Sequence, residues 1–133
     1  MNNEHEGEKL KSKYKLKKLI NSLASIKGRH TELVTVYVPV NYGLSEIISQ
    51  LRSEQSTAEN IKSKPVRKNV TSALDKIIRH LQLYKQTPQN GLALFCGNIS
   101  LKEGAADIQL TSIEPPEEIK VKMYWCDQKF VLE

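Results

Sequence analysis

The sequence predicts an α+β domain in which helices pack on a mainly antiparallel, four-stranded sheet, in the order α-β-α-α-β-β-β, with a projecting helical hairpin. Three observations predict this fold. Four short runs of β-branched or apolar residues have the length of strands, and three longer segments carry apolar residues at helical spacing. The last three strands follow one another without an intervening helix, and such connections favour antiparallel pairing.

The N-terminal part divides into a charged stretch and an amphipathic helix. Residues 1–12 show no apolar periodicity, so we expect a flexible tail followed by one domain over residues 13–133. The helix is expected to start near Lys13 and to end before Gly28, a typical C-cap residue. Lysines at positions 9, 11, 13, 15, 17 and 18 surround its apolar stripe, which favours a solvated helix face over a dedicated RNA contact. The stripe consists of Leu16, Leu19, Ile20, Leu23 and Ile26.

The next segment predicts a strand and a helical hairpin. Leu33–Val38 is rich in β-branched residues and stops at Pro39, which is typical of a buried strand. A second helix is expected after the turn at 41–45 and before the polar stretch 53–63, and a third helix begins near Pro65. The third helix is expected to bury Val66, Val70, Ala73, Leu74, Ile77, Ile78 and Leu81. Antiparallel packing of the two helices would place residues 57–63 at the tip of a hairpin.

Three strands complete the predicted sheet. The turn signal Pro88-Gln89-Asn90-Gly91 precedes an apolar run at 92–96, which predicts a central strand. Ile108–Ile113 and residues 121–124 predict two further strands on either side of Pro115-Pro116.

Composition indicates a soluble cytoplasmic protein. The longest apolar runs are too short to cross a bilayer, and the polar N-terminus lacks the apolar core of a signal peptide. Cys96 and Cys126 are too few for a disulfide framework, and their spacing suggests no zinc site. We therefore expect no metal and no cofactor. The net charge of +5 favours a polyanionic partner without requiring one.

The sequence gives little support for an enzyme. A cysteine nucleophile would need a histidine beside it, and the histidines are His5, His30 and His80. Cys96 lies in a predicted apolar strand, where a small buried residue is expected. No phosphate-binding glycine loop, His-Glu-x-x-His or Gly-x-Ser-x-Gly motif occurs. We expect no catalysis by this chain.

The polar hairpin tip is the most informative segment. Its amide, ammonium and hydroxyl groups can meet RNA phosphate, sugar and base edges, but an ordinary hydrophilic connection has the same composition. Asn60-Ile61-Lys62-Ser63 in this tip resembles the signature motif of archaeal and eukaryotic class I peptide-chain release factors. A second family motif is matched near the C-terminus by Tyr124, Cys126, Asp127, Lys129 and Phe130.

Further matches stand in register with these two motifs. His30-Thr31-Glu32 corresponds to a Gly-Thr-Ser-like turn, Glu54 to an acidic residue near the decoded bases, and Arg67 to a basic residue after the tip. The chain thus resembles the N-terminal, stop-codon-recognising domain of archaeal or eukaryotic-type class I release factors over residues 16–130. Histidine at position 30 departs from the usual glycine, and Glu32 resembles the archaeal form of the turn.

The resemblance implies a role for each matched residue. The tip, Asn60, Ile61, Lys62 and Ser63, would contact the first uridine, and Thr31, Glu32 and Glu54 would read the following purines. Tyr124 would supply a hydroxyl and an aromatic face, whereas Cys126 would be a small wall of the site or a core residue. Three residues would support the site or contact phosphates: Lys64, Arg67 and Asp127.

The same resemblance implies partners and a missing part. The partners would be the mRNA stop codon, the ribosomal RNA of the small-subunit decoding centre and, for the full-length factor, a GTPase release-factor partner or its archaeal equivalent; no membrane is expected. The Gly-Gly-Gln motif that triggers peptidyl-tRNA hydrolysis is absent, so we expect a fragment of a longer factor.

Three alternatives remain open at this point. A general basic RNA-binding or ribosome-associated protein would use its lysine-rich helix and show steep salt dependence without codon preference. A small cytosolic enzyme would need a deep pocket with perturbed titratable groups. Ribosome-rescue factors are related, but they lack the Asn-Ile-Lys-Ser tip.

Overall fold

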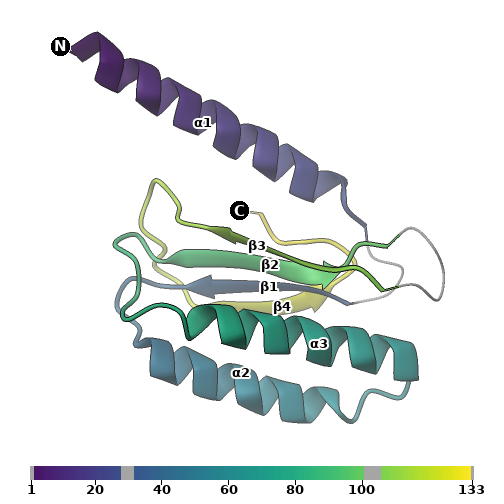
Figure 1. Cartoon of the computed structure of the whole chain (residues 1–133). Coiled ribbons are helices and arrows are strands. Elements are labelled where there is room, and N and C mark those ends of the chain that lie inside the picture. The colour runs from purple at the N-terminus through teal and green to yellow at the C-terminus, as the bar shows by residue number, and fades with distance from the viewer. Residues whose placement is uncertain (1, 28–31, 101–105, 133) are drawn as a thin grey trace.

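The computed structural model describes residues 2–27, 32–100 and 106–132, and in residues 2–12 only the backbone. The described residues form three helices and four strands: α1 (Asn2–Ser25), β1 (Leu33–Val38), α2 (Leu44–Ala58), α3 (Lys64–Leu81), β2 (Leu92–Asn98), β3 (Ile108–Ile113) and β4 (Met123–Asp127). The strands form one antiparallel sheet in the order β3-β2-β1-β4 (Figure 1). The predicted α+β class, element order and antiparallel sheet are confirmed.

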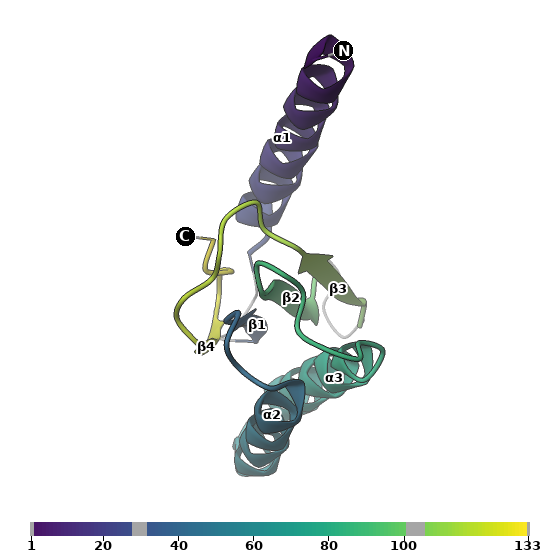
Figure 2. The same cartoon turned by 90° about the vertical axis from the view of Figure 1, so that its left-hand side faces the viewer.

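The sheet separates two layers of helix. The α2–α3 hairpin covers one face, and α1 lies over the other, leaning away from the sheet toward its N-terminus (Figure 2). Successive strand residues point to opposite faces, so Val34, Val36 and Val38 join the core beneath the hairpin. Leu33 packs on the other face with Leu23 of α1, Ala93, Phe95 and Phe130.

The hairpin supplies most of the main core. All seven apolar residues predicted for α3 are buried, which confirms the predicted face. α2 buries Ile47, Leu51 and Ala58. Burial of each leucine or isoleucine contributes about 1.5–3 kcal/mol, so the hairpin is firmly seated on the sheet. None of the helices within the described residues is long and apolar enough to span a membrane.

Two predicted helix boundaries were wrong. α1 begins at Asn2 rather than near Lys13, because residues 2–12 are rich in good helix formers and apolar periodicity marks only the part of a helix that is buried. α2 continues to Ala58 through the polar residues after Ser53, which cover its exposed side. Gly28, the expected cap of α1, lies outside the described residues, and the flexible tail stays a prediction.

The last strand also differs from its prediction. β4 runs from Met123 to Asp127 rather than over 121–124, and Val121 is exposed. Ile119 holds the preceding loop, because its backbone N–H donates to Asn90 O (2.9 Å) and its carbonyl accepts from Val40 N (3.2 Å). Pairing with β1, which places Tyr124 opposite Val36, therefore decides where the strand begins.

The predicted turn before β2 is present. Gly91 N donates to Pro88 O at 2.9 Å, and Gly91 has a φ of +89°. Only glycine adopts this conformation readily, and a Cβ at this position would overlap the carbonyl oxygen of Val38. The turn thus brings the chain from α3 tightly against the end of β1.

Candidate functional site

The hairpin tip, residues 59–63, turns the chain from α2 into α3 at one end of the molecule (Figure 1). Backbone bonds close the turn: Asn60 N donates to Thr57 O (3.0 Å), and Ile61 N donates to Ala58 O (3.1 Å). Ile61 is half-buried against the main core. The tip is therefore an ordered turn that is anchored by one apolar side chain.

Two further residues brace the tip from α3. Ser63 is the N-cap, and its Oγ accepts from Val66 N at 3.4 Å. Arg67 donates from Nη1 to the carbonyl oxygen of Ile61 at 3.2 Å. An N-cap contributes about 1 kcal/mol to the stability of a helix, so Ser63 has a structural task in addition to any contact with a ligand.

The polar groups of the tip face solvent. Asn60, Lys62, Ser63 and Lys64 are exposed. The asparagine amide can donate and accept hydrogen bonds, and the lysine ammonium can only donate. The tip can thus bind a polar or anionic group that approaches this end of the molecule.

A second group of predicted residues lies between β4 and α2. Tyr124 and Cys126 alternate with Trp125 along β4 and pack toward the hairpin. Burial raises the pKa of the Tyr124 hydroxyl, and the nearby groups of Cys126 and Glu54 raise it further. Tyr124 is therefore a neutral donor at physiological pH. Glu54 of α2, which is half-buried, supplies a carboxylate acceptor close to it.

Glu32 is held by a residue that the sequence analysis missed. The side chain of Glu32 is 3% exposed, and its Oε2 accepts a hydrogen bond from Asn69 Nδ2 at 2.7 Å. Asn69 stands three residues after Val66 and four before Ala73, on the edge of the buried face of α3. An amide at such a position needs a partner when the helix packs, and this was the available sequence signal.

The two groups share one end of the fold. The start of β1, the end of β4 and the hairpin turn lie at the same end of the molecule (Figure 1). Thr31 and His30 lie outside the described residues.

Asp127 accepts hydrogen bonds from Gln128 N (2.7 Å) and from Trp125 Nε1 (3.2 Å), and these bonds lower the pKa of its carboxyl group. Its carboxylate thus ties the turn after β4.

Cys126 offers a test of how closed this site is. Burial, followed by the charges of Asp127 and Glu32, raises the pKa of its thiol from 9.0 to about 11. Only the thiolate reacts with iodoacetamide, so at about pH 8 the folded chain should be labelled at Cys126 roughly 100-fold more slowly than the chain in urea. The labelling rate should keep rising up to about pH 11 in the folded chain and level off near pH 9 in urea. Peptide mass spectrometry measures both rates, and equal rates would mean that the thiol is not held in a buried site.

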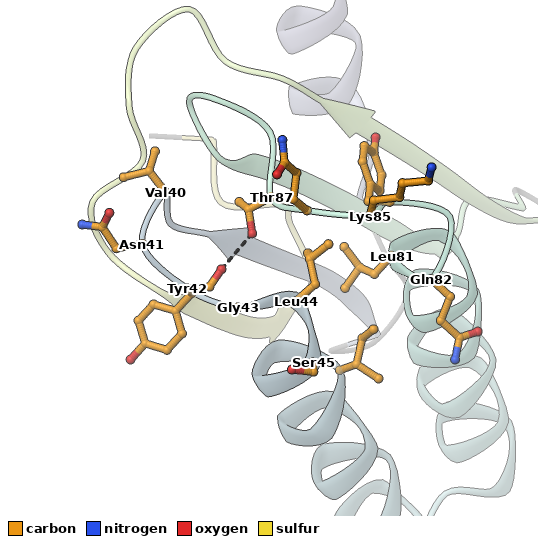
Figure 3. Close-up of a pocket in the computed structure, with 13 residues that line it drawn as sticks. Val40, Asn41, Tyr42, Gly43, Leu44, Ser45, Leu81, Gln82, Lys85 and Thr87 are labelled. Atoms are coloured by element: carbon orange, nitrogen blue, oxygen red, sulfur yellow. Dashed lines mark hydrogen bonds between the residues drawn. The ribbon is translucent and has the colours of Figure 1, made fainter.

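Two other kinds of site could bear on function, a metal site and a pocket. Among the residues that the structure describes, no cluster of His, Cys, Asp or Glu could hold a metal ion. A hollow of about 710 Å³ lies at the opposite end of the hairpin, between the start of α2 and the end of α3 (Figure 3). Its wall is closed by the bond from Thr87 Oγ1 to Tyr42 O at 2.7 Å. It is separate from every residue predicted for the site.

Comparison with known proteins gives consistent matches. The family model described as eRF1 domain 1 matches residues 11–133. Peptide chain release factor subunit 1 of Pyrococcus abyssi is 58% identical over 120 residues, which are 90% of this chain and 29% of that protein. The corresponding proteins of Thermococcus kodakarensis and Methanocaldococcus jannaschii are 55% and 41% identical over 90% and 92% of this chain, or 29% and 30% of their own length. The chain thus spans less than a third of these relatives.

Solved structures show the same likeness. A crystal structure of an archaeal translation termination factor, aRF1, superposes with a TM-score of 0.80 at 35% identity, over 90% of this chain and 32% of that one. A structure described as an archaeal protein gives a TM-score of 0.82 at 34% identity, over 90% of this chain and 33% of that one.

Proposed function

The chain belongs to the eRF1 domain 1 family, and from this membership we propose that it recognises stop codons of mRNA in the ribosome during translation termination. The observation that carries the proposal is the position of the matched motifs. The exposed tip with Asn60 and Lys62 lies at the same end of the fold as Glu32 and the C-terminal end of β4. Segments that are distant in sequence are thus brought to one end of the fold.

The tip would meet the uridine that begins every stop codon. Lys62 would donate to a carbonyl oxygen of the base, and Asn60 can pair with a donor and an acceptor at once. Ile61 anchors the turn to the core, Ser63 caps α3, and Arg67 donates a hydrogen bond to the carbonyl oxygen of Ile61. Lys64 is exposed beside them and would contact a phosphate.

The group on β4, α2 and β1 would read the two purines that follow. Glu54 is half-buried and offers a carboxylate, which accepts hydrogen bonds from exocyclic amino groups such as that of adenine. The carboxylate of Glu32 is 3% exposed and bonded to Asn69, so it would read a base only after that bond is exchanged for one to the codon. Tyr124 remains protonated and can donate from its hydroxyl group. Thr31 precedes Glu32 and would act beside it, Cys126 would form a small wall, and Asp127 would keep the neighbouring turn in place.

The partners follow from this role. They are the stop codon, the ribosomal RNA of the small-subunit decoding centre and, for a full-length factor, a GTPase release-factor partner or its archaeal equivalent. Peptidyl-tRNA hydrolysis would be triggered by another domain, so the chain itself would work in the cytoplasm as a reading domain. The stop-codon-recognition domain would comprise residues 13–133, and residues 1–12 would form a flexible N-terminal tail.

A chimaeric release factor tests the proposal. The chain is joined to the part of the Pyrococcus abyssi factor that follows the matched region, and peptide release is measured on ribosomes carrying a stop or a sense codon. We expect release at stop codons and almost none at sense codons. A folded chimaera that binds ribosomes but releases peptide equally at both codons would overturn the proposal and favour a basic RNA-binding protein without codon preference.

A further inference from the structure

α1 carries a basic surface that the proposed codon site does not use. Its basic face, defined as Lys13, Lys15, Lys17 and Lys18 of the helix together with Lys27 just after it, is exposed at every position. Helical rise places Lys13 and Lys18 about 7.5 Å apart along the axis, and Lys27 follows two residues after the end of the helix. The helix that carries this face lies on the opposite side of the sheet from the hairpin (Figure 2).

The composition of this face is unfavourable for a helix that merely faces water. No aspartate or glutamate occurs between Lys13 and Lys27. Solvated helices usually alternate charges in pairs four residues apart, whereas Lys13 and Lys17 form a like-charge pair that destabilises a helix by about 0.2–0.5 kcal/mol. A polyanion bound along the face would relieve this repulsion.

The apolar side of α1 distinguishes RNA from a membrane surface. A helix that binds a bilayer inserts its apolar stripe, but Leu23 is buried on the sheet and Ile26 packs beside it. Leu16 and Ile20 line a cleft of about 530 Å³ between α1 and the sheet. Their side chains are turned toward the protein, whereas Tyr14 and Leu19, which are 69% and 37% exposed, face solvent together with the lysines. Most of the apolar stripe is thus covered by the protein and is not free to insert into a bilayer.

We propose that the basic face of α1 binds the phosphate backbone of ribosomal RNA and anchors the domain independently of the codon. This inference rests on the proposed function in taking the ribosome as the partner. Lysine contacts to phosphate carry no sequence information, and each one adds counterion release to the binding. The hairpin tip would select the codon, and α1 would contribute affinity for the ribosome whichever codon the mRNA presents there.

Neutralising part of the face tests the inference in the chimaera. In the variant Lys13→Gln, Lys17→Gln, Lys18→Gln the half-saturating concentration for release should rise about tenfold at near-physiological salt, equally at all three stop codons. The dependence of log affinity on log salt should become shallower by about 2 to 3, because roughly 0.9 counterions are released per lost phosphate contact. The maximal release rate should not change, and glutamine preserves helix propensity.

A matched variant controls for the lost charge. The variant Arg52→Gln, Lys85→Gln, Lys122→Gln removes the same charge from exposed positions away from α1 and should leave both the concentration and the slope nearly unchanged. Equal effects of the two triple variants would refute a dedicated α1 contact. Loss of binding to anionic phosphatidylserine vesicles, with ribosome binding intact, would refute RNA in favour of a membrane. If the unmutated chimaera fails to distinguish stop from sense codons, the proposed function fails instead.

Discussion

Replacement of Lys62 by alanine is expected to lower stop-codon-dependent release by the chimaera roughly 10- to 100-fold. The ammonium group is exposed at the tip and would donate to the first base, and a hydrogen bond to a charged group contributes about 1.5–3 kcal/mol. The tip should keep its shape, because Ile61, Ser63 and Arg67 hold it without help from the Lys62 side chain. Release rates at saturating factor concentration measure the effect.

Lys68→Ala is the matched control for Lys62→Ala. Lys68 is also exposed and lies near the start of α3, so its removal changes the net charge equally. We expect Lys68→Ala to change the release rate by less than about threefold, because an exposed charge contributes little to an interaction. If Lys62→Ala and Lys68→Ala reduce release to the same small extent, the tip contributes only general charge and does not read a base.

Replacement of Glu54 by alanine is expected to lower release by a similar factor, roughly 10- to 100-fold, through the purine positions. The carboxylate lies close enough to Tyr124 to raise the pKa of its hydroxyl group, so the variant removes the acceptor from the centre of the β4–α2 group. Glu54→Gln retains the size of the side chain but replaces one acceptor oxygen by a donor, and we expect an intermediate loss. Release at each of the three stop codons measures the effect.

Glu46→Ala on the same helix controls for the loss of a carboxylate. Glu46 is exposed in the first turn of α2, far from the tip, and its removal should cost no more than about 1 kcal/mol of stability and leave release unchanged. Thermal unfolding of each variant separates misfolding from misreading. Normal release by Glu54→Ala would remove this carboxylate from the codon site.

Helical elements could be predicted from local pattern to different extents. The buried face of α3 follows from 3.6-residue spacing, because a regular helix turns the same side chains toward the core wherever it packs. Pro65 and Ser63 marked its start for the same local reason. The start of α1 was missed, because a solvated helical stretch has no periodic apolar signal.

The predicted site divides in the same way. The hairpin tip could be located from the polar stretch between two amphipathic helices, and its motif stood out within four consecutive residues. The hydrogen bond between Asn69 and Glu32 could not be predicted from the sequence, because the two residues lie 37 positions apart and meet only when α3 packs on the sheet. The grouping of Glu54 with Tyr124 depends in turn on β4 pairing with the edge of β1.

Local pattern therefore sufficed for the α+β class, the element order, the main core face and the tip, since backbone periodicity and turn chemistry act over a few neighbouring residues. Strand pairing determined the start of β4 and the group around Tyr124, and the packing of α3 on the sheet brought Asn69 to Glu32. Hydrogen bonds between strands and the desolvation of side chains depend on segments that are remote along the chain. Neither produces a periodic pattern in the sequence of a single segment, so neither can be predicted from one segment alone.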